Sequence, residues 1–293
     1  MSQLPADLQE FMETLRAPKG VNPAEMLQRY DHLMNGNPPA VGAVHNDVLL
    51  REVGNWKVTA DISVPQGAEP HPVLVYFHGG GWTMGSPKTH LRVGREFAAG
   101  GYLTINVDYR RAPKHRFPAA FDDCYFATQW AVENAARYGG DPKRLAVGGD
   151  SAGGNLAGGV LAEATQKNGP QISVGVLIYG VFDYHKALGA LGTTGPSTQF
   201  YLAEDQYEAL RGDPRVSSFY GCSKFPPCYI GVGTKDPLLP ESLALAEKLK
   251  SLGIDHDLQV IEGAPHGFFQ LTPLAAYADG YKRALAFMDK YLK

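Results

Sequence analysis

The sequence predicts a protein of the α/β class, in which a mostly parallel β-sheet lies between layers of helices. Apolar runs of strand length alternate with segments of helical periodicity over the later two thirds of the chain. Several of these runs are apolar throughout, as expected for strands covered on both faces. The 293 residues, 44% hydrophobic and 19% charged, are enough for one such domain with an insertion.

The first forty residues precede this alternation, and we expect them to form two short helices. Apolar residues recur at helical spacing from Leu8 to Leu15, and Asn22 followed by Pro23 marks the start of the second helix. The sequence NGNPPAVG then ends the helical pattern.

Strands and helices are then expected in alternation. Two strands, DVLLREV and KVTADISV, flank the turn at Gly54 and Asn55. Further strands are expected at residues 72–78, 102–109, 144–149, 172–180, 227–233 and 256–261. Helices are expected at about 89–99, 118–138, 152–166, 241–252 and 275–291. The connection at about 182–224 is far longer than an ordinary one, so we expect it to cross the sheet edge as a lid.

The composition excludes several classes of function. A net charge of -3 provides no positive field for nucleic acid or an anionic membrane. The three cysteines (Cys124, Cys222, Cys228) fit neither a zinc site nor a redox pair, so reduced thiols and a cytoplasmic location are expected. The N-terminal segment lacks the apolar core of a signal peptide, and no apolar run reaches the roughly 18 residues of a membrane span.

The sequence GGDSAGGNLAGG contains the first candidate for chemistry. Gly149, Ser151 and Gly153 match Gly-x-Ser-x-Gly between a predicted strand and a predicted helix. Such a turn exposes the serine hydroxyl and tolerates only small neighbours. Asp150 is expected to brace the turn. Taken alone, the pattern also fits a glycine-rich turn that only packs a helix close to a strand.

A second glycine-rich sequence, HGGGW from His78 to Trp82, directly follows a predicted strand. Three consecutive glycines cost conformational entropy, and backbone amides that point into an oxyanion hole would account for that cost. The alternative is a flexible loop, which has less need of the flanking histidine and tryptophan. His78 is expected to form a hydrogen bond within its own loop rather than act as a base.

A nucleophilic serine needs a base, and the base needs a carboxylate to orient it. His266 follows the last predicted strand, at the sheet edge where Ser151 is expected. Asp236 directly follows the preceding strand, whereas the rival Glu262 shares the loop of His266 and need not face its ring. The order Ser151, Asp236, His266 is that of α/β-hydrolase triads.

Five motifs together carry a family resemblance: HGGGW, DYRRAPKHRFPAA, GGDSAGGNLA, GTKDPL and HGF. In order and spacing the chain resembles the hormone-sensitive-lipase-like (bacterial family IV) carboxylesterases over about residues 40–293. The resemblance implies an α/β-hydrolase fold with an eight-stranded, mostly parallel sheet. It also implies a helical cap built from residues 1–45 and an insertion at about 182–224, on a catalytic domain of residues 46–293.

The resemblance also assigns roles to residues. Ser151 would be the nucleophile, Asp236 the acid and His266 the base, and the amides of Gly80, Gly81 and Ala152 would form the oxyanion hole. Supporting residues are expected in the oxyanion loop and in the turn of the nucleophile: His78, Gly79, Trp82, Gly149, Asp150 and Gly153.

The chain departs from the family pattern at two places. Arg111 and Lys114 replace the usual Leu and Glu, which predicts a changed local ion pair rather than a changed reaction. Pro240 replaces a second aspartate after the acid, so an auxiliary contact to the histidine loop would be weaker or would come from Glu241.

The predicted function is hydrolysis of short-to-medium-chain carboxylic esters by way of an acyl-enzyme, with a small-molecule ester as the partner and without a cofactor or a metal. Cleavage of an aryl-formamide or another amide on the same fold is the enzymatic alternative. The alternative of another class is a non-catalytic small-ligand receptor, which the intact triad disfavours. The sequence leaves a homodimer open and does not identify the physiological ester.

Overall fold

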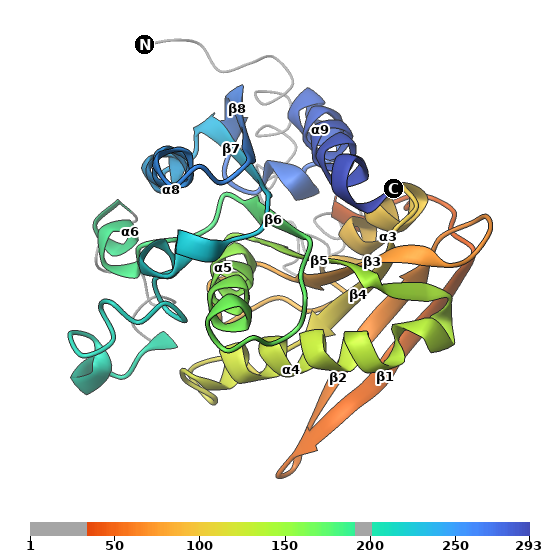
Figure 1. Cartoon of the computed structure of the whole chain (residues 1–293), viewed down its shortest axis with the longest axis horizontal. Helices are drawn as coiled ribbons and strands as arrows, with labels where there is room; N and C mark the ends of the chain where they lie inside the picture. The colour runs from red at the N-terminus through yellow and green to blue at the C-terminus, as the bar shows by residue number, and fades with distance from the viewer. Residues whose placement is uncertain (1–33, 191–200) are drawn as a thin grey trace, which may run out of the picture.

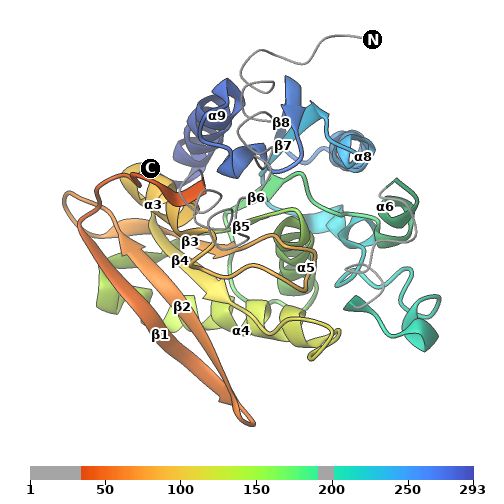
Figure 2. The same ribbon diagram turned by 180° about the vertical axis from the view of Figure 1, so that it is seen from behind.

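A computed structural model describes residues 34–190 and 201–293, in which helices cover both faces of an eight-stranded sheet (Figure 1, Figure 2). The two expected N-terminal helices fall within residues 1–33, outside the described residues. The strands are β1 (Ala43–Val53), β2 (Trp56–Val64), β3 (His71–Phe77), β4 (Leu103–Asp108), β5 (Gly140–Asp150), β6 (Val174–Ile178), β7 (Cys228–Lys235) and β8 (His256–Pro265).

The strand order is β1-β2-β4-β3-β5-β6-β7-β8. The β1–β2 and β2–β4 pairs are antiparallel, and every other neighbouring pair is parallel, which confirms the predicted mostly parallel sheet. Strands β3, β5, β7 and β8 therefore end at the same edge. The residues that directly follow these four strands are His78, Ser151, Asp236 and His266.

The helices form one layer on each face of the sheet. Helices α3 (Leu91–Ala99) and α9 (Ala275–Leu292) cover one face, and α4 (Ala119–Asn134), α5 (Ala152–Gln166) and α8 (Leu239–Ser251) cover the other. Strand β3 shows why both layers are needed. Val75 and Phe77 pack into the core beneath α4 and α5, whereas Leu74 and Tyr76 pack into the core beneath α3 and α9. Both faces of this central strand are buried, as its continuous apolar sequence predicts.

The long connection between β6 and β7 is described except at residues 191–200. It contains helix α6 (Tyr184–Ala190) and the short 3₁₀ helices η2 (Glu204–Gln206), η3 (Ser218–Tyr220) and η4 (Cys222–Lys224). Helices η3 and η4 pack against α5. Two further 3₁₀ helices lie elsewhere, η1 (Ala135–Tyr138) after α4 and η5 (Phe268–Gln270) after β8. The cap role expected for residues 182–224 stays a prediction.

The three cysteines are buried and form no disulfide bond. Burial raises the pKa of all three thiols (Cys124, Cys222 and Cys228), so each stays protonated at neutral pH. Within residues 34–190 and 201–293, no helix has both the length and the apolar character needed to cross a membrane.

Candidate active site

The serine turn lies at the junction of β5 and α5. Strand β5 ends at Asp150, α5 begins at Ala152, and Ser151 between them has a φ of 54°, in the left-handed region. The turn has no room for larger neighbours, because a Cβ atom on Gly153 would lie 1.9 Å from the carbonyl oxygen of Phe77. A Cβ on Gly149 would lie 2.4 Å from the carbonyl oxygen of Gly153. This is the strained strand-to-helix geometry that the sequence predicts for an exposed serine hydroxyl.

The structure brings the three predicted catalytic side chains together. The Nε2 atom of His266 lies 2.9 Å from the hydroxyl oxygen of Ser151, and its Nδ1 lies 2.8 Å from Oδ2 of Asp236. Because a carboxylate only accepts, Nδ1 carries the hydrogen and Nε2 is left to accept the serine proton. The ring of Tyr179 packs 4.8 Å from the ring of His266 and restricts its movement. This arrangement can activate a serine for nucleophilic attack.

Asp236, and not its rival Glu262, contacts the ring of His266. The Asp236 side chain is fully buried, and its Oδ1 accepts a hydrogen bond of 2.8 Å from the backbone N–H of Leu238. That bond leaves Oδ2 free to face His266. Glu262 lies on β8 with an exposed side chain.

A pocket of about 360 Å³ opens at this edge of the sheet. Polar backbone and catalytic groups line one part of it, and apolar or amphipathic side chains line the rest: Gly80, Gly81, Trp82, Met84, Asp150, Ser151, Ala152, Tyr179, Val181, Leu238, His266, Gly267 and Gln270. The three predicted oxyanion-hole residues are therefore in the same pocket as Ser151. Within the described chain, no backbone carbonyl accepts from the N–H groups of Gly80 or Gly81. Ala152 is the first residue of α5, so its N–H has no partner within the helix.

The oxyanion loop is held by buried side chains on both sides. His78 is fully buried and stacks on Tyr109 with ring centroids 4.2 Å apart, and its Nδ1 donates to the carbonyl oxygen of Gly79 at 2.8 Å. Burial, and secondarily the charge of His90, lowers the pKa of His78 to about 3. His78 is therefore neutral and supports its own loop, as the sequence indicates.

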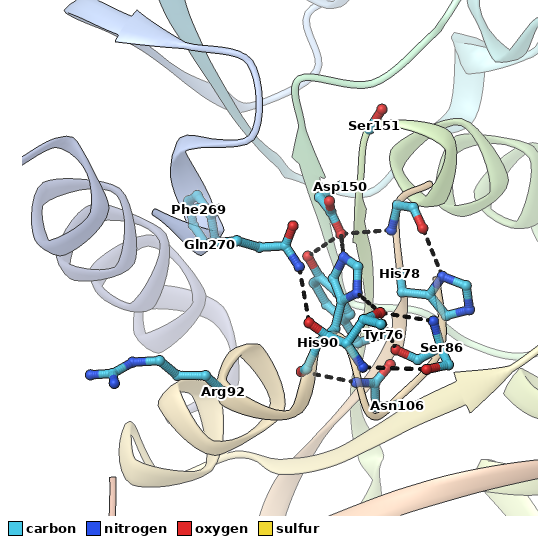
Figure 3. Close-up of polar contacts among 12 residues, drawn as sticks. Tyr76, His78, Ser86, His90, Arg92, Asn106, Asp150, Ser151, Phe269 and Gln270 are labelled. Atoms are coloured by element: carbon cyan, nitrogen blue, oxygen red, sulfur yellow. Dashed lines mark hydrogen bonds and ion pairs between the residues drawn. The ribbon is translucent and has the colours of Figure 1, made fainter. Parts of the chain in front are cut away.

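Asp150 braces the turn through contacts that the sequence analysis only partly anticipates. Its buried carboxylate oxygen Oδ1 accepts hydrogen bonds from the Tyr76 hydroxyl at 2.8 Å and from the backbone N–H of Gly79 at 3.0 Å (Figure 3). His90 approaches the same oxygen at 3.4 Å. These contacts agree with the expected bracing role, and Tyr76 and His90 are further candidates that the sequence did not reveal. The sequence contained only an indirect indication of these partners, because a buried carboxylate beside a nucleophile requires hydrogen-bond or charge partners.

The departures from the family pattern have local explanations. Arg111 pairs with Asp108, and the Lys114 ammonium lies 5.1 Å from the centroid of the Trp56 ring. Both contacts agree with the expected local change. Glu241, by contrast, does not reach the histidine loop. Its carboxylate accepts the backbone N–H groups at the start of the long connection, from Phe182 at 3.0 Å and from Asp183 at 2.6 Å.

No cluster of three or more His, Cys, Asp or Glu side chains suited to a metal ion occurs in the part of the chain that the structure describes.

Comparison with protein families gives one match that spans most of the chain. The model of the alpha/beta hydrolase fold family matches residues 74–270, which include every predicted catalytic and oxyanion-hole residue. Among curated proteins, carboxylesterase NlhH of Mycobacterium tuberculosis is 33% identical over 240 residues, which cover 75% of this chain and 74% of that protein. The ethyl acetate hydrolase of Pseudomonas putida is 35% identical over 218 residues, 70% of this chain and 69% of that protein.

Solved structures share the fold over nearly the whole length. The hyperthermophilic esterase of the archaeon Pyrobaculum calidifontis superposes with a TM-score of 0.82 at 25% identity and covers 99% of both chains. The thermostable carboxylesterase EstE1 from a metagenomic library superposes with a TM-score of 0.80 at 27% identity, over 94% of this chain and all of that one.

Proposed function

This chain belongs to the alpha/beta hydrolase fold family and resembles its hormone-sensitive-lipase-like esterases, and from that premise we propose that it is a serine carboxylesterase acting on esters of short-to-medium-chain acids. One observation carries the proposal. The hydroxyl of Ser151, the imidazole of His266 and the carboxylate of Asp236 form a continuous hydrogen-bonded line beside the pocket. The relatives named carboxylesterase and ethyl acetate hydrolase support the same reaction.

In the proposed mechanism, Ser151 attacks the ester carbonyl carbon while Nε2 of His266 takes the hydroxyl proton. The carbonyl oxygen becomes negative and receives hydrogen bonds from the N–H groups of Gly80, Gly81 and Ala152. His266 returns the proton to the departing alkoxide, which leaves as the alcohol. Water then attacks the acyl-serine, His266 removes its proton, and the carboxylic acid is released with Ser151 regenerated.

The size of the pocket suits a small acyl or alcohol group. About 360 Å³ is near the lower end of ligand sites, and the side chains of Val181 and Leu238 give it an apolar part. We expect nitrophenyl butyrate to be cleaved faster than long-chain nitrophenyl esters. A preference for emulsified long-chain triglyceride would contradict this substrate class.

The decisive experiment is an acyl-chain-length series on the wild type and on Ser151→Ala, with exposed Ser223→Ala as the matched control. We expect Ser151→Ala to lose several orders of magnitude in kcat/KM on every ester and Ser223→Ala to match the wild type. Faster cleavage of N-formylkynurenine than of the butyryl ester would favour the amide-hydrolase alternative. A fluorophosphonate probe that fails to label the wild type would favour a receptor.

We propose three further features of this esterase: a cap that includes residues 182–224, a cytoplasmic location and a homodimer. Val181 lies directly before residues 182–224 and lines the pocket, which supports a role for those residues in substrate choice. Exchange of residues 182–224 between relatives of different acyl preference would test this role. The molar mass in solution, measured by light scattering, would test the dimer.

A further inference from the structure

A second carboxylate–imidazole pair lies beneath the oxyanion loop, apart from Asp236 and His266. Oδ1 of Asp150 and Nε2 of His90 are 3.4 Å apart, and both side chains are about 95% buried. Figure 3 shows the His90 ring below the Asp150 carboxylate, on the side away from Ser151. The His90 ring therefore lies beneath the pocket and is not part of its lining, whereas Asp150 lines the pocket beside Ser151.

The hydrogen bonds of Thr89 assign a proton to Nδ1 of His90. The Thr89 hydroxyl donates to the carbonyl oxygen of Ser86 at 2.9 Å, and a carbonyl oxygen can only accept. The only hydroxyl hydrogen is thereby used. His90 Nδ1, at 3.0 Å from the same hydroxyl oxygen, must then donate to it.

The second ring nitrogen also faces an acceptor. Burial alone would raise the pKa of Asp150, but the contact with His90 at 3.4 Å and the hydrogen bond from Tyr76 hold it below its usual value. Asp150 is therefore an ionised carboxylate. An unprotonated Nε2 would point its lone pair at the negatively charged Oδ1 of Asp150, which is unfavourable. A hydrogen on Nε2 as well as on Nδ1 would make His90 an imidazolium that balances the charge of Asp150.

The backbone around this pair positions the oxyanion loop. Oδ1 of Asp150 also accepts the N–H of Gly79, the residue directly before the two glycines of the proposed oxyanion hole. The backbone of His90 is itself fixed, since its carbonyl oxygen accepts from the side chain of Asn106 at 3.2 Å. Ser151 is held by different bonds, from its own N–H to the carbonyl oxygen of Ile178 and from the N–H of Asn155 to its carbonyl oxygen.

We propose that His90 is a positioning residue for the oxyanion hole, a buried cation that neutralises and fixes Asp150 and through it the loop at Gly79. This inference rests on the proposed esterase function. Without the cation, an unbalanced carboxylate would line the pocket in which the substrate oxygen becomes negative, and it would oppose that charge. The side chains that activate Ser151 are not part of the pair, so its loss should affect the oxyanion and leave the nucleophile in place.

The titratable groups around His90 are few within the described chain. Asp150 faces it from the end of β5, the neutral His78 lies with its ring centroid 5.4 Å away after β3, and Tyr76 of β3 shares the carboxylate oxygen. Arg92 on α3 points away and donates to Tyr277 at 2.8 Å. Asp150 is thus the anion to which the His90 charge is coupled.

The kinetic test compares His90→Gln with His71→Gln, a buried histidine at the far end of β3. Each variant is assayed on nitrophenyl butyrate and on the matching thionoester, whose sulfur makes poor use of an oxyanion hole. For His90→Gln we expect kcat on the oxygen ester to fall by about tenfold to a hundredfold with KM nearly unchanged, since a whole oxyanion donor contributes more. The oxygen-to-thiono rate ratio should fall as well, and Asp150→Asn combined with His90→Gln should recover part of the loss. His71→Gln should keep the wild-type ratio.

A spectroscopic test is independent of activity. In ¹⁵N-histidine-labelled protein, the signal that disappears in His90→Gln should show two nearly equivalent protonated nitrogens at neutral pH. A neutral ring would overturn the proposal, and so would His90→Gln with wild-type kcat or with both esters slowed equally. Wild-type protein that cleaves no ester would overturn the proposed function, and the positioning role with it, whereas an imidazolium with an unchanged rate ratio would overturn the positioning role alone.

Discussion

The indole N–H of Trp82 donates a hydrogen bond of 3.2 Å to the side-chain oxygen of Asn155. The amide nitrogen of Asn155 donates in turn to the carbonyl oxygens of Val181 at 2.8 Å and Val216 at 2.7 Å. One fully buried side chain on α5 thus joins the oxyanion loop to two points of the connection between β6 and β7.

We expect Asn155→Ala to lower the free energy of unfolding by about 3 to 5 kcal/mol, because three buried partners would lose their hydrogen bonds at roughly 1–3 kcal/mol each. Urea denaturation measures the change. Asn46→Ala, on the exposed part of β1, is the control and should change little. A loss below about 1 kcal/mol for Asn155→Ala would mean that water replaces these bonds readily.

The second prediction concerns the orientation of the base. Asp236→Asn should lower kcat/KM for butyryl ester by about 10⁴-fold, because an amide nitrogen facing His266 would stabilise the wrong tautomer. The fold should persist, since the asparagine oxygen can still accept the N–H of Leu238. Glu262→Gln is the matched control, and an equal loss in that variant would restore Glu262 as the orienting acid.

The third prediction concerns the close packing of the oxyanion loop. A Cβ atom on Gly79 would lie 2.5 Å from Oδ2 of Asp150, so Gly79→Ala must displace the loop or the carboxylate. We expect kcat to fall by about 10²-fold, comparable to the loss of one oxyanion donor. Gly212→Ala, where an added Cβ meets no atom within 4 Å, should retain wild-type kinetics. Steady-state assays on the butyryl ester would show the difference.

The fourth prediction is an acid sensitivity that His78 imposes. Its pKa falls to about 3 in the folded protein, chiefly through burial, while the unfolded chain keeps a value near 6.5. Between these values the unfolded state binds the extra proton, so His78 contributes stability above pH 6.5 that is lost as the pH falls toward 3. The expected slope is about 1.4 kcal/mol per pH unit.

His78→Asn should remove this one-proton slope from a series of urea denaturation curves between neutral and acidic pH. His256→Asn, in which the histidine is partly exposed on β8, serves as the control and should keep the wild-type slope. Identical pH slopes in the wild type and His78→Asn would show that the buried imidazole can take up a proton in the folded state.

The positions of Ser151, Asp236 and His266 could be predicted from the sequence because each directly follows a strand. Apolar runs locate the strands, and parallel topology brings their carboxyl ends to one edge. The first and last residues of the strands were harder to predict from the sequence. Strand β5 begins at Gly140 rather than at residue 144, because Gly140 and Asp141 pair with His71 and Pro72 of β3 despite a composition typical of a turn.

The roles of His90 and Glu241 could not be predicted, because they depend on partners brought close only by tertiary packing. His90 follows a loop with no recognisable motif, and its partner Asp150 is sixty positions further along the chain. Glu241 was expected near the histidine loop if it made a contact at all. The direction of α8 instead carries its carboxylate to the amides of Phe182 and Asp183.

The burial of all three native thiols has a practical consequence for spectroscopy. Maleimide dyes react with exposed thiolates, and Cys124, Cys222 and Cys228 offer none in the folded state. A single cysteine introduced at Gly212, on the long connection, would therefore take up one fluorophore without prior removal of the native residues. The fluorescence of this dye would then report the binding of an ester in real time.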